Sequence, residues 1–365
     1  MPNFDILRKA EPAKTFRVAS VMGAFDLQTN AVQEHFAGSI DLPDQWSVGL
    51  IVGASGTGKT TIARELFPDA YIERFEYTHE CLLDDMPQGV SVSDITRALT
   101  SVGFSSVPSW LKSYAMLSNG EKMRCDLARA ILSDNKMFVF DEFTSVVDRN
   151  VARVGSYAMQ RAVRKAGKQF VAVTCHYDVE DWLLPDWVFD TNTMTFRICE
   201  GQKKNKPECR LRVYETKAKD HYWRIFGKYH YLNHEHHKAA RVFVATLNDD
   251  LCAFLSVLHF VHPKKHNTWR GHRAVVLPDY QGIGVGGGMM NFVADLLAKE
   301  GKHMTVTTSN PSMISALRKS PLWRMTRHDR VSAGSVSGFN WMHNKHSAKL
   351  SSSARITAAF EYKKQ

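Results

Sequence analysis

Short, continuous apolar runs alternate with helix-like patterns in the first 200 residues. The runs predict buried strands at Trp46–Val52, Met137–Phe140, Gln169–Thr174, Trp182–Asp190 and Thr195–Cys199. Parallel strands covered on both faces have this pattern, because neither face is solvated. Between two of them, Met123, Leu127 and Ile131 recur every four residues, as on the buried face of a helix. The pattern predicts an α/β domain. We interpret Phe16–Leu27, nearer the N-terminus, as an early strand with a turn.

A second pattern follows the segment Gly201–Glu208, which is polar, basic and contains proline. A strand restarts at Leu211–Tyr214. The later elements are a strand at Ala274–Leu277, an apolar helix bearing Met290, Val293, Ala294 and Leu297, a strand at Met304–Thr308, a helix at Ser312–Arg318 and an alternating strand at Ala354–Tyr362. At 365 residues the chain is long enough for two cores. We therefore predict domains at 1–200 and 209–365, joined by a linker at 201–208.

Charge is distributed unevenly between these two parts. Residues 1–200 hold 20 Lys and Arg against 26 Asp and Glu, whereas residues 201–365 hold 27 against 11 and 13 of the 16 histidines. The second part therefore carries a net charge of +16, which favours an anionic partner. A solvated basic surface without a partner is the alternative.

Composition narrows the class of protein further. Hydrophobic residues make up 44% and charged residues 23% of the chain, as in soluble globular proteins. No apolar run approaches the roughly 20 residues that span a bilayer, and the N-terminus lacks an apolar signal core. We expect a cytoplasmic protein without a membrane partner. The six cysteines have no CxxC spacing, which favours small buried side chains over a metal or disulfide framework.

A glycine-rich loop follows the strand at Trp46–Val52 and precedes a helix at Thr61–Leu66. Its sequence, GASGTGKT, has the GxxxxGKT spacing in the strand–loop–helix context of a P-loop. Backbone N–H groups of such a loop turn toward phosphates, the lysine reaches the β- and γ-phosphates, and the threonine binds Mg²⁺. The predicted nucleotide-binding residues are Gly53, Ser55, Gly56, Gly58, Lys59, Thr60 and Thr61.

Two further strand ends supply polar side chains. Asp141 and Glu142 follow the strand Met137–Phe140, 82 residues after Lys59. Asp141 is expected to hold Mg²⁺ together with Thr60, and Glu142 to polarise the attacking water. His176 comes after the strand Gln169–Thr174.

With LSNGE at Leu117–Glu121 and SVVD at Ser145–Asp148, residues 15–200 resemble an ABC-type ATPase. The resemblance implies that His176 contacts the γ-phosphate. It also implies an ATP-dependent head-to-tail homodimer, in which Ser118 and Gly120 contact the nucleotide held by the partner. Asn119 and Glu121 depart from the usual Gly and Gln of the signature. Candidates for the Q-loop residue are Asp84, Asp85 and Gln88. The usual Q-loop glutamine is not evident, and the segment before Leu117 leaves room only for a reduced helical subdomain, which together disfavour a transporter subunit.

A second glycine-rich turn, QGIGVGG, lies between the strand Ala274–Leu277 and the apolar helix. A dinucleotide-binding fold is the rival interpretation, but the acidic residue expected about 20 residues later is absent. The Q-x-x-G-x-G motif after a VVLP strand resembles the acyl-CoA loop of GNAT acyltransferases, over residues 209–363. This family implies an α+β domain with a mixed central sheet and a cofactor of acetyl-CoA or another acyl-CoA. The implied binding residues are Val276, Gln281, Gly282, Gly284 and Gly286.

The proton acceptor is not given by that motif. Tyr229–Asn233 reads YHYLN, which resembles an early motif of Mom-type DNA-modifying enzymes within the GNAT-like proteins. By this resemblance His230 and Tyr231 act near the acceptor nitrogen. A structural loop with packed aromatic residues is the alternative, and a zinc site built from the neighbouring His234, His236 and His237 is less favoured.

Basic and aromatic residues are interleaved in the second part, as at Trp223-Arg224, Trp269-Arg270 and Trp323-Arg324. Such stretches suit phosphate contacts combined with base stacking. We therefore favour an ATP-driven acyltransferase that modifies a nucleic-acid base, with DNA favoured over RNA. The alternatives are an RNA acetyltransferase, acylation of small amines, a transporter subunit with an accessory domain, and a sensor in which acyl-CoA only regulates the ATPase.

Overall fold

The structure is a computed structural model that describes residues 3–10, 13–26, 32–199, 210–230, 236–261, 266–330 and 356–363. Two compact units are present: unit 1 combines Met1–Tyr77 with Arg129–Pro207, and unit 2 combines Thr78–Ala128 with Glu208–Gln365. Residues 78–128, which the sequence places inside the first domain, are thus grouped with unit 2. The linker at 201–208 lies outside the described residues, and the domain boundary there stays a prediction.

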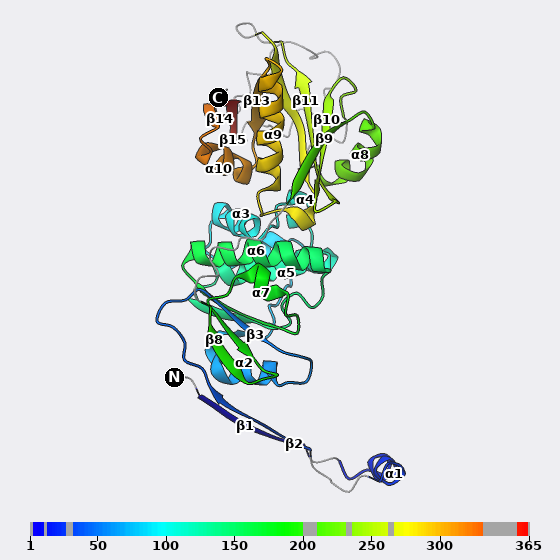
Figure 1. Cartoon of the computed structure of the whole chain (residues 1–365), viewed down its shortest axis with the longest axis vertical. Coiled ribbons are helices and arrows are strands. Elements are labelled where there is room, and N and C mark those ends of the chain that lie inside the picture. The colour runs from blue at the N-terminus through cyan, green and yellow to red at the C-terminus, as the bar shows by residue number, and fades with distance from the viewer. Residues whose placement is uncertain are drawn as a thin grey trace. The chain divides into compact units, whose positions relative to one another are not determined.

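Unit 1 is built on a six-stranded sheet in the order β4-β5-β6-β3-β7-β8. Figure 1 labels β3 and β8 of this sheet. The strands are β3 (Val48–Val52), β4 (Tyr71–Ile72), β5 (Met137–Phe140), β6 (Gln169–Thr174), β7 (Trp187–Asp190) and β8 (Thr195–Ile198). All neighbours are parallel except β7 and β8. The sheet is accompanied by α2 (Lys59–Leu66), η1 (Pro68–Ala70), α6 (Arg149–Ala166) and α7 (Val179–Leu183). This confirms the predicted α/β architecture.

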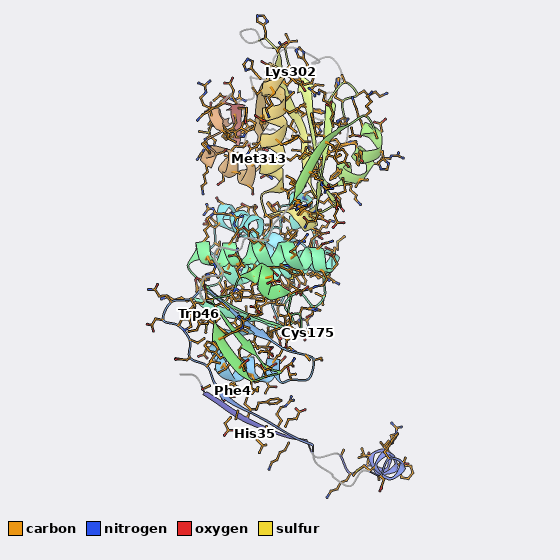
Figure 2. The ribbon with its side chains drawn as sticks, viewed as in Figure 1. Phe4, His35, Trp46, Cys175, Lys302 and Met313 are labelled. Carbon is orange, nitrogen blue, oxygen red and sulfur yellow. The ribbon has the colours of Figure 1, made fainter. Side chains whose placement is uncertain are left out.

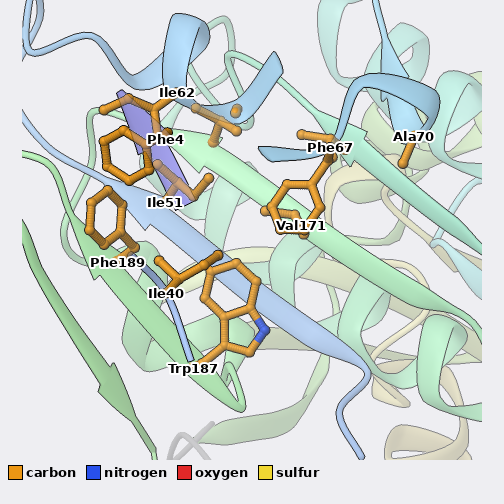
Figure 3. Close-up of a cluster of buried hydrophobic side chains, with 12 residues drawn as sticks. Phe4, Ile40, Ile51, Ile62, Phe67, Ala70, Val171, Trp187 and Phe189 are labelled. Carbon is orange, nitrogen blue, oxygen red and sulfur yellow. The ribbon is translucent and has the colours of Figure 1, made fainter. Parts of the chain in front are cut away.

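The apolar runs of unit 1 meet in one core (Figure 3). Trp187 is fully buried, and its ring packs edge-on against Trp46 at a centroid distance of 5.4 Å. Figure 2 labels Trp46 and also Cys175, which marks the end of β6. Burying each large apolar side chain stabilises the fold by about 1.5–3 kcal/mol. The core therefore holds the carboxyl ends of β3, β5, β6 and β7 in place.

Near the N-terminus, β1 (Asn3–Ala10) pairs antiparallel with β2 (Val32–Ser39). Phe4 of β1 packs edge-on against Phe189, with 5.7 Å between the ring centroids. The segment between the two strands contains α1 (Phe16–Ala24), so the predicted strand at Phe16–Leu27 is wrong. The Thr15 side chain accepts a hydrogen bond from the backbone N–H of Val18, which favours a helix start.

Unit 2 contains a seven-stranded sheet in the order β14-β15-β13-β12-β11-β10-β9. The strands are β9 (Leu211–Thr216), β10 (Arg241–Leu247), β11 (Asp250–His259), β12 (Thr268–Val276), β13 (His303–Thr308), β14 (Trp323–Arg330) and β15 (Ile356–Tyr362). Only the β12–β13 pair is parallel, so the sheet is mixed, as predicted. The helices of this part are α8 (Lys219–Phe226), η5 (Gly227–Tyr229), η6 (Pro278–Tyr280), α9 (Val285–Lys299) and α10 (Pro311–Lys319). β10, β11 and β14 were not predicted from the sequence.

The remaining part of unit 2, residues 78–128, is helical. It holds η2 (Leu82–Asp85), α3 (Val92–Ser101), α4 (Val107–Trp110), η3 (Tyr114–Met116) and the start of α5 (Asn119–Leu132). Asp85 is buried and accepts hydrogen bonds from the backbone N–H groups of Thr78 and His79. The carboxylate of this Q-loop candidate therefore stabilises the turn between Thr78 and η2. No helix among the described residues is both long and apolar enough to cross a bilayer.

Candidate functional sites

The P-loop joins the buried strand β3 to α2 through a backbone that favours glycine. Gly56 and Gly58 have φ values of 85° and 80°, and Gly58 is the N-cap of α2. Lys59 is 9% exposed, and its Nζ donates to the carbonyl oxygen of Ala54 at 2.6 Å. Ser55 is exposed on the loop. The glycine turn, the helix N-terminus and the ammonium group together form a site that fits nucleotide phosphates.

The predicted Mg²⁺ residues lie together beside this loop. Thr60 Oγ1 donates to Asp141 Oδ2 at 2.7 Å, and the hydroxyl of Tyr71 donates to the same oxygen at 2.6 Å. Burial and the hydrogen bond to Asp141 raise the pKa of Tyr71 to about 12, so Tyr71 is protonated at neutral pH. One carboxylate and one hydroxyl suit Mg²⁺, which takes its other ligands from phosphates and water.

Glu142 and His176 leave neighbouring parallel strands at the same edge of the sheet. Glu142 is exposed and has a φ of 52°, and Thr144 in the same turn has a φ of 67°. A β-branched residue at positive φ is unusual, and strain of this kind clusters at functional sites. The backbone N–H of Phe143 donates to Val173 O at 2.9 Å, which ties the turn to β6.

Sequence reasoning missed two residues that follow β7. Thr191 Oγ1 and Thr57 Oγ1 are 2.5 Å apart, and Asn192 Oδ1 accepts from the backbone N–H of Ala54 at 3.0 Å. A Cβ added at Gly53 would lie 2.2 Å from Thr191 Oγ1, so Gly53 makes room for the neighbouring strand. The signal was present, because polar residues directly after a buried parallel strand lie at the ligand edge.

The signature residues begin α5 with a reciprocal capping arrangement. Ser118 Oγ accepts from the backbone N–H of Glu121 at 3.3 Å, and Glu121 Oε2 accepts from the backbone N–H of Ser118 at 3.0 Å. Glu121 Oε1 also accepts from Ser109 Oγ at 2.7 Å. The departure from the usual signature at Glu121 therefore has a structural role, and Gly120 lies in the first turn of α5.

In unit 2 the second glycine-rich loop connects β12 to α9. Gly282 and Gly284 have φ values of 85° and 97°, and Gly284 is the N-cap of α9. A Cβ added at Gly284 would meet nothing within 4 Å, whereas one at Gly286 would lie 3.2 Å from Val276 Cγ2. Gly286 thus permits close packing of α9 on β12. The exposed turn and the N–H groups at the helix start fit a diphosphate.

The Gln281 side chain folds back to the end of β12, where its Nε2 donates to the carbonyl oxygen of Val276 at 2.9 Å. β12 pairs with β13 only over Thr268–Arg270, while its antiparallel pairing with β11 continues to Val276. β12 and β13 therefore separate before the loop begins. Within the described part of the chain, the end of β12 is left without a strand neighbour on that side, beside α9.

Histidine and aromatic rings gather near α8 and β12. His230 is 7% exposed, with 5.9 Å between its ring centroid and that of Trp223. His236 and His272 are 5.8 Å apart by the same measure. Burial, aided by the nearby Arg273, lowers the pKa of His272 to about 4. Tyr231 and His234 lie outside the described residues, and the parts of the chain that are described hold no cluster of three potential metal ligands.

The tryptophans proposed to stack on bases are engaged within unit 2. Trp323 is 3% exposed, and its Nε1 donates to Asn291 Oδ1 at 2.7 Å. Trp223 packs against Phe254, and the cations of Arg241 and Lys302 lie over the ring of Trp269. Burial leaves no free ring face for stacking on Trp323, whereas Trp223 and Trp269 are partly exposed, so their stacking role stays a prediction. The adjoining basic side chains stay exposed: Arg224, Arg270, Arg324 and Arg327.

Residues 202–319 match the acetyltransferase (GNAT) family model. Most of this match lies within the predicted second domain, 209–365. Among solved structures, an acetyltransferase from Bacillus subtilis in complex with CoA is 12% identical, covers 42% of this chain and 97% of its own, and has a TM-score of 0.31. An IAA acetyltransferase from Bacillus cereus is 12% identical, with coverages of 42% and 98% and a TM-score of 0.32.

The chain is also similar to solved structures of another kind. A dimeric bacterial ABC transporter cassette is 14% identical, covers 46% of this chain and 93% of its own, and has a TM-score of 0.36. No curated protein sequence matches the chain. The architecture of unit 1 is described by its own strand order and P-loop contacts.

Proposed function

We propose that the chain hydrolyses ATP in unit 1 and uses acyl-CoA to acylate an amine nitrogen of a nucleic-acid base, with DNA favoured. The observation that carries this proposal is the presence of two separate phosphate-binding loops, one before α2 and one before α9. Among the described residues, the first loop has a lysine and a threonine–carboxylate pair beside it, whereas residues 277–287 of the second contain no Lys or Arg. One site therefore suits a nucleotide that is hydrolysed, and the other a diphosphate that is only held.

In the ATP site, Lys59 and the loop N–H groups bind the phosphates. Thr60 and Asp141 would hold Mg²⁺, which supplies charge neutralisation when bound. Glu142 polarises the attacking water, and His176 contacts the phosphate that is cleaved. Ser118 and Gly120 complete the site of a partner protomer in an ATP-dependent head-to-tail homodimer.

In the GNAT domain, Gln281, Gly282, Gly284 and Gly286 shape the loop for the CoA diphosphate. The backbone at Val276 polarises the thioester carbonyl. The acceptor nitrogen attacks the carbonyl carbon, the C–S bond breaks, and the CoA sulfur leaves as a thiolate that is then protonated. We assign His230 and Tyr231 to the acceptor side, where one of them takes the proton from nitrogen.

The nucleic-acid acceptor is supported by charge. Residues 201–365 carry a net +16, and exposed arginines adjoin the strands and helices of the GNAT domain. Because Trp323 is buried and the arginines beside it are exposed, phosphate contacts rather than stacking carry this part of the proposal. Binding to DNA should therefore weaken steeply with salt, and full affinity in 0.5 M salt would contradict a phosphate-based interface.

Mass spectrometry of nucleosides from DNA and RNA of expressing cells is the direct test. The wild-type chain is compared with Gly284→Glu and with Gly301→Glu. Both glycines have left-handed backbones, with φ values of 97° and 73°, and an added Cβ at either meets nothing within 4 Å. Only Gly284 precedes the helix at the loop. We expect an acylated nucleoside in DNA with the wild type and Gly301→Glu, and none with Gly284→Glu.

Other outcomes separate the alternatives. An acylated nucleoside confined to RNA would favour an RNA acetyltransferase. A profile identical in all three strains, with CoA bound by the purified protein, would favour a small amine or a sensor. Dimerisation is tested separately with Glu142→Gln, which should form an ATP-bound dimer by light scattering. A protein that stays monomeric with ATP would exclude the sandwich arrangement.

A further inference from the structure

The acyl-CoA loop contacts the helical segment 78–128 within unit 2. The Gln281 side chain uses both ends of its amide: Nε2 donates to Val276 O at 2.9 Å, and Oε1 accepts from the backbone N–H of Ser105 at 2.7 Å. A single side chain thus links the end of β12 to the connection between α3 and α4. Gln281 is therefore set both by the loop that carries it and by the segment that contains the signature motif.

Gly103 gives a second contact at the same place. Its φ is 86°, and a Cβ added there would lie 2.7 Å from the carbonyl oxygen of Gln281. Backbone atoms cannot rotate away as a flexible side chain does, so any larger residue would push the two segments apart. The following residues are held firmly, because Trp110 Nε1 donates to Phe104 O at 3.0 Å. The close approach is consequently a built feature of the connection.

A third contact comes from α5. Arg124 is 1% exposed, and its Nη1 lies 3.5 Å from Asp279 Oδ1 while its Nη2 donates to Asp279 O at 3.4 Å. A buried guanidinium depends on such partners, because its desolvation is costly when they are removed. Asp279 belongs to η6, which immediately precedes Gln281. The guanidinium of Arg124 and the backbone of Ser105 therefore contact neighbouring residues of the same loop.

The signature residues lie at the start of this helix. Ser118 caps α5 through the reciprocal bonds with Glu121, and Arg124 follows one turn later. An α-helix rises 1.5 Å per residue, so Arg124 is roughly 6 Å along the axis from Gly120. A displacement of the helix start is thus transmitted to Arg124 with little loss, since a capped helix moves as a rigid rod over this distance.

We infer that Gly103, Ser105 and Arg124 are positioning residues for the acyl-CoA loop and make acyl-CoA affinity depend on the nucleotide state of the signature motif. The inference rests on the proposed function, because it requires that the loop at Gln281–Gly286 binds CoA. Coupling is reciprocal: if ATP changes the affinity for CoA by some factor, CoA changes the affinity for ATP by the same factor.

The test measures CoA binding by titration calorimetry in Glu142→Gln, with and without ATP, and compares Gly103→Ala with Gly89→Ala in that background. Gly89 is the matched control, because it lies in the same segment with a φ of 81° but an added Cβ meets nothing within 4 Å. We expect ATP to change the Kd for CoA by about fivefold or more in the parent and in Gly89→Ala. Gly103→Ala should reduce this ratio toward one.

A milder variant guards against misfolding of Gly103→Ala. Asp279→Asn removes the charge that faces Arg124 from a side chain that is half exposed, and Asp295→Asn removes an exposed carboxylate of α9 as its control. We expect Asp279→Asn to lower the ATP-dependent ratio while CoA still binds without nucleotide.

Different results would contradict the proposed acyltransferase function and the proposed coupling. If wild-type protein does not bind CoA at all, the proposed acyltransferase is wrong. If CoA binds equally with and without ATP in the parent, or if Gly103→Ala and Asp279→Asn keep the full ratio, only the coupling is wrong.

Discussion

The loop before α2 and the loop before α9 have the same backbone design but different side chains. Each joins a strand to a helix through a left-handed N-cap glycine, with φ values of 80° at Gly58 and 97° at Gly284. Lys59 and Thr60 follow the first glycine, whereas Val285 and Gly286 follow the second, and residues 277–287 contain no Lys or Arg. Backbone geometry at both loops thus fits an anion, and we propose that the neighbouring side chains determine whether the bound anion reacts.

That difference matches the demands of the two proposed reactions. Phosphoryl transfer moves charge on the bound phosphates, so a lysine, a metal site and a nearby carboxylate are needed. The diphosphate of CoA takes no part in acyl transfer and only has to be held in position. A neutral loop is sufficient for this purpose, because the chemistry occurs at the other end of the molecule.

The largest effect is expected for Lys59→Ala. Loss of the ammonium group should lower ATP hydrolysis about 10²–10³-fold, the usual cost of removing one charge-stabilising donor. CoA affinity without nucleotide should be unchanged, because the second loop uses no lysine. Phosphate release and calorimetry measure the two activities. Lys136→Ala, an exposed lysine that precedes β5, is the control. Unchanged hydrolysis in Lys59→Ala would contradict the view that the lysine is what suits the first loop to phosphoryl transfer.

Tyr71→Phe tests the carboxylate that is proposed to hold Mg²⁺ beside the first loop. The variant removes the hydroxyl that donates to Asp141 Oδ2 and leaves Thr60 as the donor to that oxygen. A hydrogen bond to a charged group contributes about 1.5–3 kcal/mol, so the Mg²⁺ concentration for half-maximal hydrolysis should rise about tenfold. Saturating Mg²⁺ should restore most of the rate. An unchanged Mg²⁺ requirement would show that Tyr71 does not position Asp141.

Tyr71 also shows where sequence reasoning reached its limit. Thr60 and Asp141 were expected to lie together because each follows a strand within a recognisable motif, and their side chains are 2.7 Å apart. Tyr71 lies on a two-residue strand that no periodicity reveals. The contact between Gly103 and Gln281 joins positions far apart in the chain, so no local pattern predicts it.

The errors have equally specific causes. The helix at Phe16–Ala24 was predicted as a strand because its apolar residues are irregularly spaced, although Thr15 offered a capping signal. Interleaved arginine and tryptophan suggested base stacking, yet burial of Trp323 follows from its position beside Asn291. Composition identifies which residues are basic or aromatic but not which way they face.

Gly287 allows the charge difference between the loops to be reversed. It lies in the first turn of α9, and a Cβ added there meets nothing within 4 Å. Gly287→Lys should tighten CoA binding about two- to fivefold, and Gly287→Glu should weaken it by a similar factor, because a charge at a helix N-terminus contributes about 0.3–1 kcal/mol. Gly287→Gln is the neutral control. The Lys and Glu effects should both shrink in high salt, and equal affinities at low salt would show that no phosphate binds there.

The smallest expected effect is on the pH dependence of stability, which should differ between the two units. Burial lowers the pKa of His272 in unit 2 to about 4, below its unfolded value of about 6.5. The unfolded state then binds more protons between these values, so stability is constant above pH 6.5 and falls as pH drops toward 4. In unit 1, burial of Asp186 opposes the hydrogen bonds from Arg164, but the pKa is still lowered, so its contribution is lost only below the usual range of aspartate.

Acid sensitivity between pH 6.5 and 4 should therefore involve His272 and not Asp186. We expect Tm to fall less between pH 7 and pH 4.5 in His272→Gln than in the wild type, by about 2 °C, since solvent screens a half-exposed imidazole. His259→Gln, at an exposed histidine of the neighbouring β11, should keep the wild-type slope. Scanning calorimetry at both pH values measures the difference. A parallel loss of Tm in His272→Gln would place the acid-sensitive group elsewhere and remove this distinction between the units.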